Sequence, residues 1–166
     1  FPDAAVYSFP VSDGGDGLLD AIQPHTGAVR QSCPVRGPLG KPLHADILWI
    51  PGSRTAVIES AAASGLVLVP GSSRNPLKTT THGTGELILH ALSMNPGRIL
   101  VGLGGSASCD GGTGAASAAG VRFLDARGRN FLPRGGNLSR IRAIDLSGRH
   151  PDIAGMIIEG LCDVDN

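Results

Sequence analysis

A glycine-rich segment, GLGGSASCDGGTG at residues 102–114, constrains the fold of this chain more than any other feature. It follows Arg98–Val101, an aliphatic run typical of a buried strand in a parallel sheet, and precedes a small-residue helix expected at 115–119. A strand, a glycine-rich turn and a helix in this order indicate an α/β layer whose backbone N–H groups converge on a phosphate. Alternatively, the glycines only allow the strand and the helix to pack closely.

Before this layer, turn signals predict an antiparallel meander. Strand-like runs at 28–35, 43–50 and 55–59 are separated by Gly-Pro-Leu-Gly-Lys-Pro and Pro-Gly-Ser-Arg, both strong turn sequences. Such short connections join antiparallel strands, because parallel neighbours need a longer crossover. The expected fold class is therefore α/β: a parallel-sheet layer with a glycine-rich strand-loop-helix, plus an antiparallel meander that forms a different piece, part of a second domain.

The remaining segments suggest two domains. Residues 1–27 are interpreted as part of a first α/β domain whose N-terminal strand is missing, and residues 28–166 as an inserted second α/β domain. The chain has no initiator Met and no signal-peptide layout, which suggests a piece cut from something longer. The other predicted elements are a buried strand at 4–9, further strands at 121–124 and 157–163, helices at 18–22 (ending near Pro24), 86–92 and 139–144, and a loop at 145–151.

Charge and composition argue against several classes of partner. The chain carries 14 basic and 14 acidic residues with no basic run, so neither nucleic acid nor an anionic membrane is an expected partner. No apolar stretch approaches the roughly 20 residues of a membrane span. The 3 cysteines are far apart, which disfavours a disulfide scaffold or a zinc site and favours reduced thiols in the cytoplasm.

Two aspartates, Asp13 and Asp110, each begin an Asp-Gly-Gly tripeptide, which would expose the carboxylate on a tightly turned backbone. Asp-Gly turns also form for structural reasons alone, but two of them in one chain favour a functional role. In phosphoryl transfer such carboxylates hold Mg²⁺ or position the attacking hydroxyl. Asp163, at the end of a predicted strand, is a candidate metal ligand because α/β sheets bind ligands beyond the carboxyl ends of their strands.

Hydroxyl groups and glycines near these aspartates are the candidate binding residues. The run at 79–85, Thr-Thr-Thr-His-Gly-Thr-Gly, is either an elaborate helix cap or a binding loop, and His82 is the one histidine of interest. Glu59 either faces the cleft or is a structural acid. The candidate substrate- or phosphate-binding residues are Gly14, Gly15, Thr80, Thr81, Thr84, Gly104, Gly105, Ser106 and Ser108.

Other nucleotide-binding motifs fit less well. Gly102-x-Gly104-x-x-Ala107 matches a dinucleotide fingerprint, and Asp125 lies where a ribose-binding acid would, but Asp110-Gly-Gly interrupts the helix that this motif requires. A P-loop is absent, because the one Gly-Lys pair, at Lys41, is followed by Pro42 rather than Ser or Thr.

Taken in order, these segments resemble the bacterial type I glycerate kinase family. The resemblance rests on motifs that span nearly the whole chain: PVSDGGDG (10–17), GPLG (37–40), AVIESAAASGL (56–66), NP (75–76), TTTHGTGELI (79–88), GLGGSASCDGG (102–112) and CDVDN (162–166). The family's usual Ala-Thr-Asn-Asp-Gly-Gly is here Ala-Ser-Cys-Asp-Gly-Gly, so that Cys109 replaces an amide, and Asp16 replaces a glutamate.

The resemblance implies ATP-dependent, Mg²⁺-assisted phosphorylation of D-glycerate in a cleft between two α/β domains, with a homodimer as a further expectation. Asp110 and Asp13 are then the catalytic candidates. Two alternatives stay open: a non-catalytic, degenerate module of the same fold, which Cys109 would favour, and an NAD-dependent oxidoreductase using the dinucleotide fingerprint.

Overall fold

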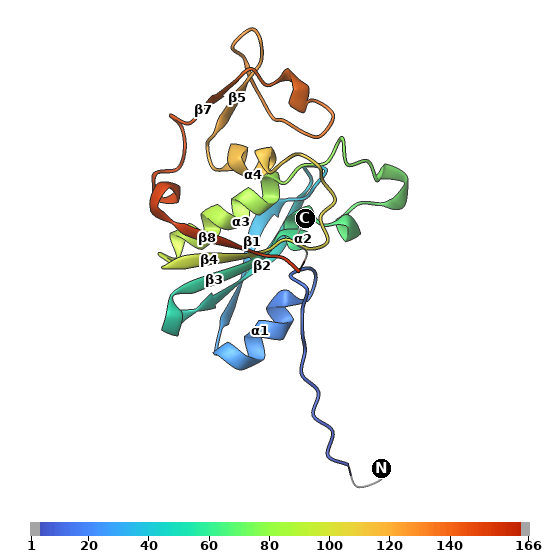
Figure 1. The fold of residues 1–166 in the computed structure, drawn as a ribbon, viewed down its shortest axis with the longest axis vertical. Helices are drawn as coiled ribbons and strands as arrows, with labels where there is room; N and C mark the ends of the chain where they lie inside the picture. Colours follow the sequence, from blue (N-terminus) through green and yellow to red (C-terminus); the bar gives the residue numbers. More distant parts are fainter. Residues whose placement is uncertain (1–3, 164–166) are drawn as a thin grey trace.

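A mixed five-stranded sheet forms the centre of the molecule in the computed structural model, which describes residues 4–163 (Figure 1). Its strand order is β1-β2-β3-β4-β8, and a separate three-stranded sheet has the order β6-β5-β7. The α/β fold class is therefore confirmed. The strands of the large sheet are β1 (Val29–Arg36), β2 (Pro42–Ile50), β3 (Thr55–Glu59), β4 (Arg98–Gly102) and β8 (Ile157–Leu161).

The antiparallel meander is confirmed, but it is not a separate piece. β1, β2 and β3 pair antiparallel in succession. β3 then pairs parallel with β4, from Thr55 opposite Arg98 to Glu59 opposite Gly102, and β4 pairs parallel with β8. The meander and the parallel layer share one sheet because β3 pairs with β2 on one side and with β4 on the other. As a central strand, β3 is almost entirely buried.

Helices cover both faces of this sheet (Figure 1). On one face, α1 (Leu18–Thr26) packs Leu18 and Leu19 against Leu48 and Val57. The other face packs against α2 (Ser60–Ser64) and α3 (His82–Ser93), with Ile47 and Ile58 fully buried there. Alternate strand residues thus serve two cores, as the period of two requires. α4 (Thr113–Ala118) lies on α3, and short 3₁₀ turns occupy Pro51–Ser53, Leu66–Leu68, Gly71–Ser73, Leu138–Arg140 and Pro151–Gly155.

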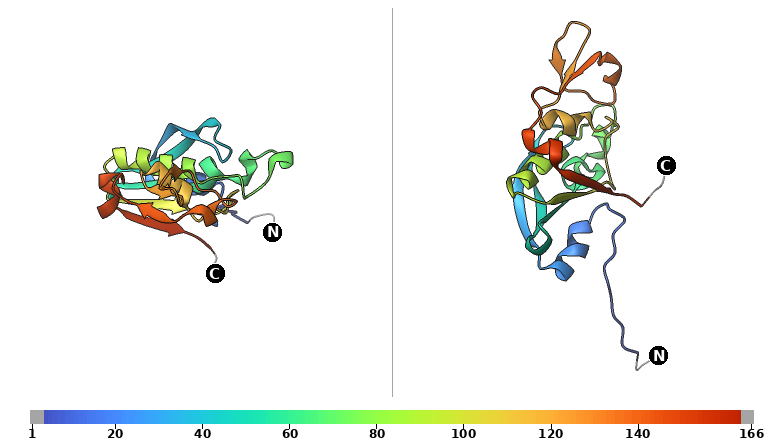
Figure 2. Two further views of the ribbon diagram at one scale, coloured as in Figure 1. Left: turned by 90° about the horizontal axis from the view of Figure 1, so that it is seen from above. Right: turned by 60° about the vertical axis from the view of Figure 1, so that its left-hand side comes forward.

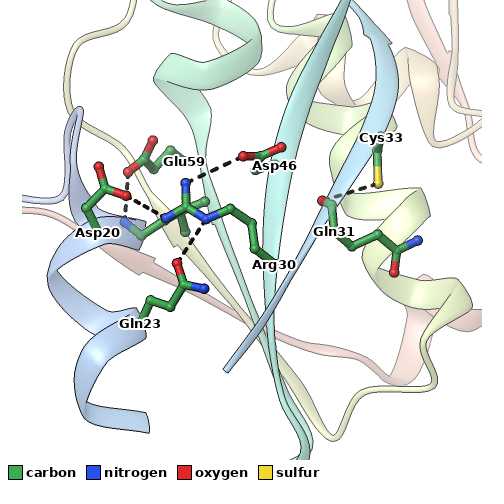
Figure 3. A network of polar contacts seen from close by, with 8 residues as sticks. Asp20, Gln23, Arg30, Gln31, Cys33, Asp46 and Glu59 are labelled. Atoms are coloured by element: carbon green, nitrogen blue, oxygen red, sulfur yellow. Dashed lines mark hydrogen bonds and ion pairs between the residues drawn. The ribbon is translucent and has the colours of Figure 1, made fainter. Parts of the chain in front are cut away.

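Arg30 of β1 ties α1 to the sheet (Figure 3). Its guanidinium donates to Asp20 of α1 at 2.5 Å, to Gln23 at 3.0 Å and to Asp46 of β2 at 3.5 Å. The helix extends two residues past Pro24 and ends at Gly27, whose φ of +62° is a left-handed helix end that glycine adopts without strain. The arginine contacts fix α1 against β1 and β2.

The small sheet contains β5 (Arg122–Leu124), β6 (Asn130–Phe131) and β7 (Ala143–Asp145), all antiparallel. It projects beyond α4 at one end of the molecule (Figure 2). The helix predicted at 139–144 is wrong: the region holds a 3₁₀ turn followed by β7, whose pairing with β5 overrides the local preference. The loop predicted at 145–151 accordingly begins inside β7.

The strand predicted at 4–9 is also wrong. This segment pairs with no strand within the described residues and runs away from the body of the molecule (Figures 1 and 2). Its large side chains are exposed, with Val6 at 88% and Tyr7 at 80% of their full accessibility. An apolar run forms a strand only where a neighbouring strand accepts its hydrogen bonds.

No helix within residues 4–163 is long and apolar enough to cross a membrane.

Candidate functional site

Three loops meet where the parallel strands β3, β4 and β8 end. The Gly104 N–H donates to the Gly14 carbonyl at 3.1 Å, and the Leu103 N–H donates to the Leu161 carbonyl at 3.0 Å. The loop of the first Asp-Gly-Gly, the glycine-rich loop and the end of β8 are therefore joined by backbone hydrogen bonds. Crevices outside the carboxyl ends of parallel strands are the usual ligand sites of α/β sheets.

Glycines allow this close approach. A Cβ placed on Gly104 would lie 2.5 Å from the Gly15 Cα, and one on Gly14 would lie 2.5 Å from the Leu161 carbonyl oxygen. Gly14 also has a φ of +88°, which side chains disfavour. Close packing of backbone on backbone therefore accounts for these glycines in the structure, and the phosphate contact expected of Gly14, Gly15, Gly104 and Gly105 stays a prediction.

A cavity of about 300 Å³ opens beside this junction; we call it the Asp13 cavity. The Asp13 carboxylate accepts a hydrogen bond from the Gly15 N–H at 2.8 Å through Oδ1, which leaves Oδ2 without a protein donor among the described residues. Asp163 lies on the same cavity, so the two predicted carboxylates share one space. The lining residues are Ser12, Asp13, Gly14, Leu18, Gly160, Leu161, Cys162 and Asp163.

Glu59, at the end of β3, has a structural contact instead. Its Oε1 accepts the Leu19 N–H at 2.8 Å (Figure 3). Leu19 is in the first turn of α1, where backbone N–H groups have no acceptor within the helix. The carboxylate of Glu59 thus caps α1 from a neighbouring strand, and of the two roles considered for it the structure supports the structural one.

Asp110 lies in different surroundings, although it begins the same tripeptide. It is 1% exposed. Oδ2 accepts the Thr81 N–H at 2.8 Å and the Gly114 N–H at 3.2 Å, and Oδ1 accepts the Gly112 N–H at 3.0 Å. The hydroxyls of Thr80 and Thr81 lie 3.3 and 3.0 Å from Oδ2. We call Asp110 with these four donor residues the Asp110 clasp; it joins the start of α3 to the start of α4.

The threonine run serves this clasp rather than capping α3 in the usual way. Thr81 precedes α3 but makes no side-chain cap to that helix; its hydroxyl accepts the Ala115 N–H of α4 at 3.0 Å. Thr84 is buried and its hydroxyl lies 2.8 Å from that of Ser64, which joins α3 to α2. The substrate contacts expected of Thr80, Thr81 and Thr84 stay predictions, and the observed partners of all three are protein groups.

Ser106 and Ser108 line a second cavity, of about 180 Å³, which we call the serine cavity. Their hydroxyls lie 3.2 Å apart. Neither lines the Asp13 cavity, so the structure divides the predicted site residues among three places. Cys109 and Arg74 also line the serine cavity; no motif had singled out Arg74, because a lone arginine in a polar loop carries no pattern.

The dinucleotide interpretation does not agree with the structure. The glycine-rich loop continues to Gly112, and the next helix begins only at Thr113. A dinucleotide fingerprint needs its helix directly after the glycines, so that the helix N-terminus meets the pyrophosphate.

Within residues 4–163, no group of three or more His, Cys, Asp or Glu side chains could hold a metal ion by itself.

Comparison with known proteins decides the family. The family model described as "Glycerate kinase family" matches residues 1–166. The chain belongs to the glycerate kinase family. It is 47% identical over 166 residues to a glycerate kinase of Bacillus subtilis (strain 168) and 45% identical to a glycerate 2-kinase of Escherichia coli (strain K12). The resemblance noted from the motifs is therefore confirmed.

A solved structure of this family has the same fold. A crystal structure described as a candidate glycerate kinase 2 from Salmonella typhimurium LT2 matches with a TM-score of 0.89 at 43% identity, over 99% of this chain and 45% of that one. The chain likewise spans 44% of the length of the Bacillus and Escherichia enzymes. The chain therefore corresponds to less than half the length of these relatives.

Proposed function

We propose that the protein containing this chain phosphorylates D-glycerate with ATP. The observation that carries the proposal is the match of all 166 residues to the glycerate kinase family, with 45% identity to a glycerate 2-kinase. That relative's name favours 2-phosphoglycerate as the product. The carboxyl-end crevice of β3, β4 and β8 supports the proposal, since α/β folds place small ligands there.

The Asp13 cavity has the donor chemistry that a Mg²⁺–ATP complex requires. Mg²⁺ prefers carboxylate oxygens and is typically held by only one or two of them, together with substrate phosphates and water. Asp13 and Asp163 line this cavity, and Ser12 adds a hydroxyl. We assign Asp13 and Asp163 to the bound Mg²⁺, which would neutralise charge on the phosphates. Of the candidate glycines, Gly14 lines this cavity, and Gly15, Gly104 and Gly105 belong to the adjoining loop junction, from which they would approach the phosphates.

The Asp110 clasp supports catalysis through position. A carboxylate that accepts backbone N–H groups from two loops has little capacity left for a metal ion, and burial separates it from bulk solvent. We therefore assign Asp110 as a positioning residue that holds the glycine-rich loop against the threonine loop. Ser106 and Ser108, on the serine cavity, are assigned to the glycerate, whose carboxylate and hydroxyls need hydrogen-bond donors and acceptors.

The test uses the complete protein. Purified enzyme is supplied with ATP, Mg²⁺ and D-glycerate, and ADP release is followed by a coupled assay while ³¹P NMR identifies the phosphoglycerate. We expect ADP release that depends on D-glycerate. A folded protein that releases no ADP in response to glycerate would support the degenerate-module alternative, for which Cys109 is the specific observation. A cytoplasmic location and a homodimer stay predictions from the sequence; cell fractionation tests the first and light scattering the second.

A further inference from the structure

A cluster of arginines lines a cavity in the small sheet, away from the three places described above. The cavity measures about 330 Å³ and is lined by Asp125, Ala126, Arg127, Arg129, Arg140 and Arg142; we call it the arginine pocket. The chain as a whole has a net charge of zero. Four arginines and a single aspartate line this space, so it is strongly positive within a neutral protein.

The one carboxylate of the pocket is already engaged. Asp125 Oδ1 accepts the backbone N–H groups of Arg127 and Arg129 at 2.9 and 3.1 Å. Oδ2 forms ion pairs with the guanidinium of Arg129 at 3.1 Å and with the guanidinium of Arg140 at 3.6 Å. These hydrogen bonds, led by the Arg129 N–H, lower the pKa of Asp125, so this side chain stays ionised. One negative charge against four positive ones leaves an excess of about three at neutral pH, since arginine keeps its proton.

Most of the guanidinium groups are held in place before any ligand arrives. Arg140 lies over the Phe131 ring, 4.6 Å from its centre. Arg142 donates through Nη1 to the carbonyls of Ser139 and Ile141 at 2.6 and 3.0 Å. Donors that are fixed in advance lose less conformational entropy when they bind an anion. The Arg127 guanidinium, in contrast, has no hydrogen-bond or ion-pair partner among residues 4–163.

We propose that the arginine pocket binds a small molecule carrying two or more phosphate groups. The planar guanidinium fork matches phosphate oxygens in pairs, which makes arginine the usual partner of phosphate. The cavity volume lies at the lower end of small-molecule sites, and it favours a compact ligand over a macromolecule. None of its lining residues lines the Asp13 cavity, so this is a second phosphate site, independent of the proposed function.

The probe is inorganic pyrophosphate, titrated into the purified protein by isothermal calorimetry without Mg²⁺. We expect one binding event that weakens as salt rises, because exposed charge pairs are screened. Arg127→Gln combined with Arg142→Gln should weaken binding by roughly tenfold or more, since each charge-assisted contact contributes substantially. The control is Arg149→Gln, which removes the same charge next to the same small sheet but outside the pocket, and should leave binding unchanged.

Three results would overturn the proposal. Pyrophosphate binding that survives the double substitution would place the ligand elsewhere, and equal binding of citrate would show that charge alone, not phosphate, is recognised. A short RNA that binds while pyrophosphate does not would point to a macromolecular surface. Because Arg142 supports its own turn, thermal unfolding of each variant is recorded, and Arg127→Gln alone serves as the folded variant if the double variant melts early.

Discussion

Asp13 and Asp110 begin the same Asp-Gly-Gly tripeptide, yet their carboxylates lie in opposite surroundings. Asp13 accepts one hydrogen bond, from the Gly15 N–H, and opens on a cavity that Asp163 also lines. Asp110 is buried and accepts backbone N–H groups from three residues, one of them from a loop about 30 positions earlier in the chain. The tripeptide thus specifies a turn, and the neighbouring chain decides whether the carboxylate meets a ligand or the protein.

Removing the Asp110 carboxylate is the most direct test of this difference between the two aspartates. In Asp110→Ala, several buried donors lose their acceptor, at about 1–3 kcal/mol each when left unsatisfied. We expect a loss of roughly 3–5 kcal/mol in the free energy of unfolding, within the range for a broken buried network. Urea denaturation measures it. Asp13→Ala is the matched control, with an expected loss below about 1 kcal/mol; equal losses in the two variants would show that the clasp contributes no special stability.

The second prediction compares turnover, as well as stability, between variants of the same two aspartates. In the complete enzyme, Asp13→Asn should lower turnover by about 10²-fold while the unfolding transition stays where it is, because only a ligand contact is lost. Asp110→Asn should lower turnover by a similar factor and also lower the melting temperature, since an amide cannot accept all the donors of the clasp. Asp152→Asn, at an exposed surface aspartate, is the control. Unchanged turnover in Asp13→Asn would remove Asp13 from the site.

Sequence patterns were sufficient to predict most of the central sheet, while the predicted site residues stay predictions. Buried aliphatic runs and tight-turn residues are local signals, and they located β1 to β4 within one or two residues. The rule that ligands bind beyond strand ends singled out Asp163, and the structure places it on the same cavity as Asp13, a proximity that the sequence did not predict. Their roles as metal ligands remain to be tested.

The features that the sequence did not predict have a common cause, because each depends on contacts between residues far apart in the chain. Whether 4–9 forms a strand, or whether 143–145 pairs with β5, depends on a partner far away in sequence. The burial of Asp110 likewise depends on donors from the threonine loop. The arginine pocket could not be predicted from the sequence, because its arginines are interspersed with other residues and form no basic run. Only the pairing of β5 with β6 and β7 brings Arg127, Arg129, Arg140 and Arg142 together.

The third prediction concerns the glycines that let the loops meet. Gly104→Ala would place a Cβ 2.5 Å from the Gly15 Cα, a clash that only a backbone shift can relieve. Overpacking of this kind costs about 1–3 kcal/mol, so we expect a lower melting temperature and, in the complete enzyme, a higher Michaelis constant for ATP. Gly52→Ala is the control, because a Cβ there would meet no atom within 4 Å. If both variants melt together, the Gly14–Gly104 junction is more adaptable than its geometry indicates.

The smallest expected effect is a change with pH in the free energy of unfolding, caused by His82 at the start of α3, beside the Asp110 clasp. Burial lowers the pKa of His82; Glu86, whose carboxylate lies 3.4 Å away, opposes this and Arg36 reinforces it. Because the folded state binds the proton less well than the unfolded chain, the contribution of His82 to stability is complete above the ordinary histidine pKa of about 6.5 and declines as the pH falls below it. His82→Gln removes the titrating group. The difference in unfolding free energy between wild type and His82→Gln should therefore shift against the wild type between about pH 7 and pH 5, the range around the ordinary histidine pKa. An NMR titration that places the His82 pKa at or above its ordinary value would contradict this, and would mean that the ion pair with Glu86 outweighs burial.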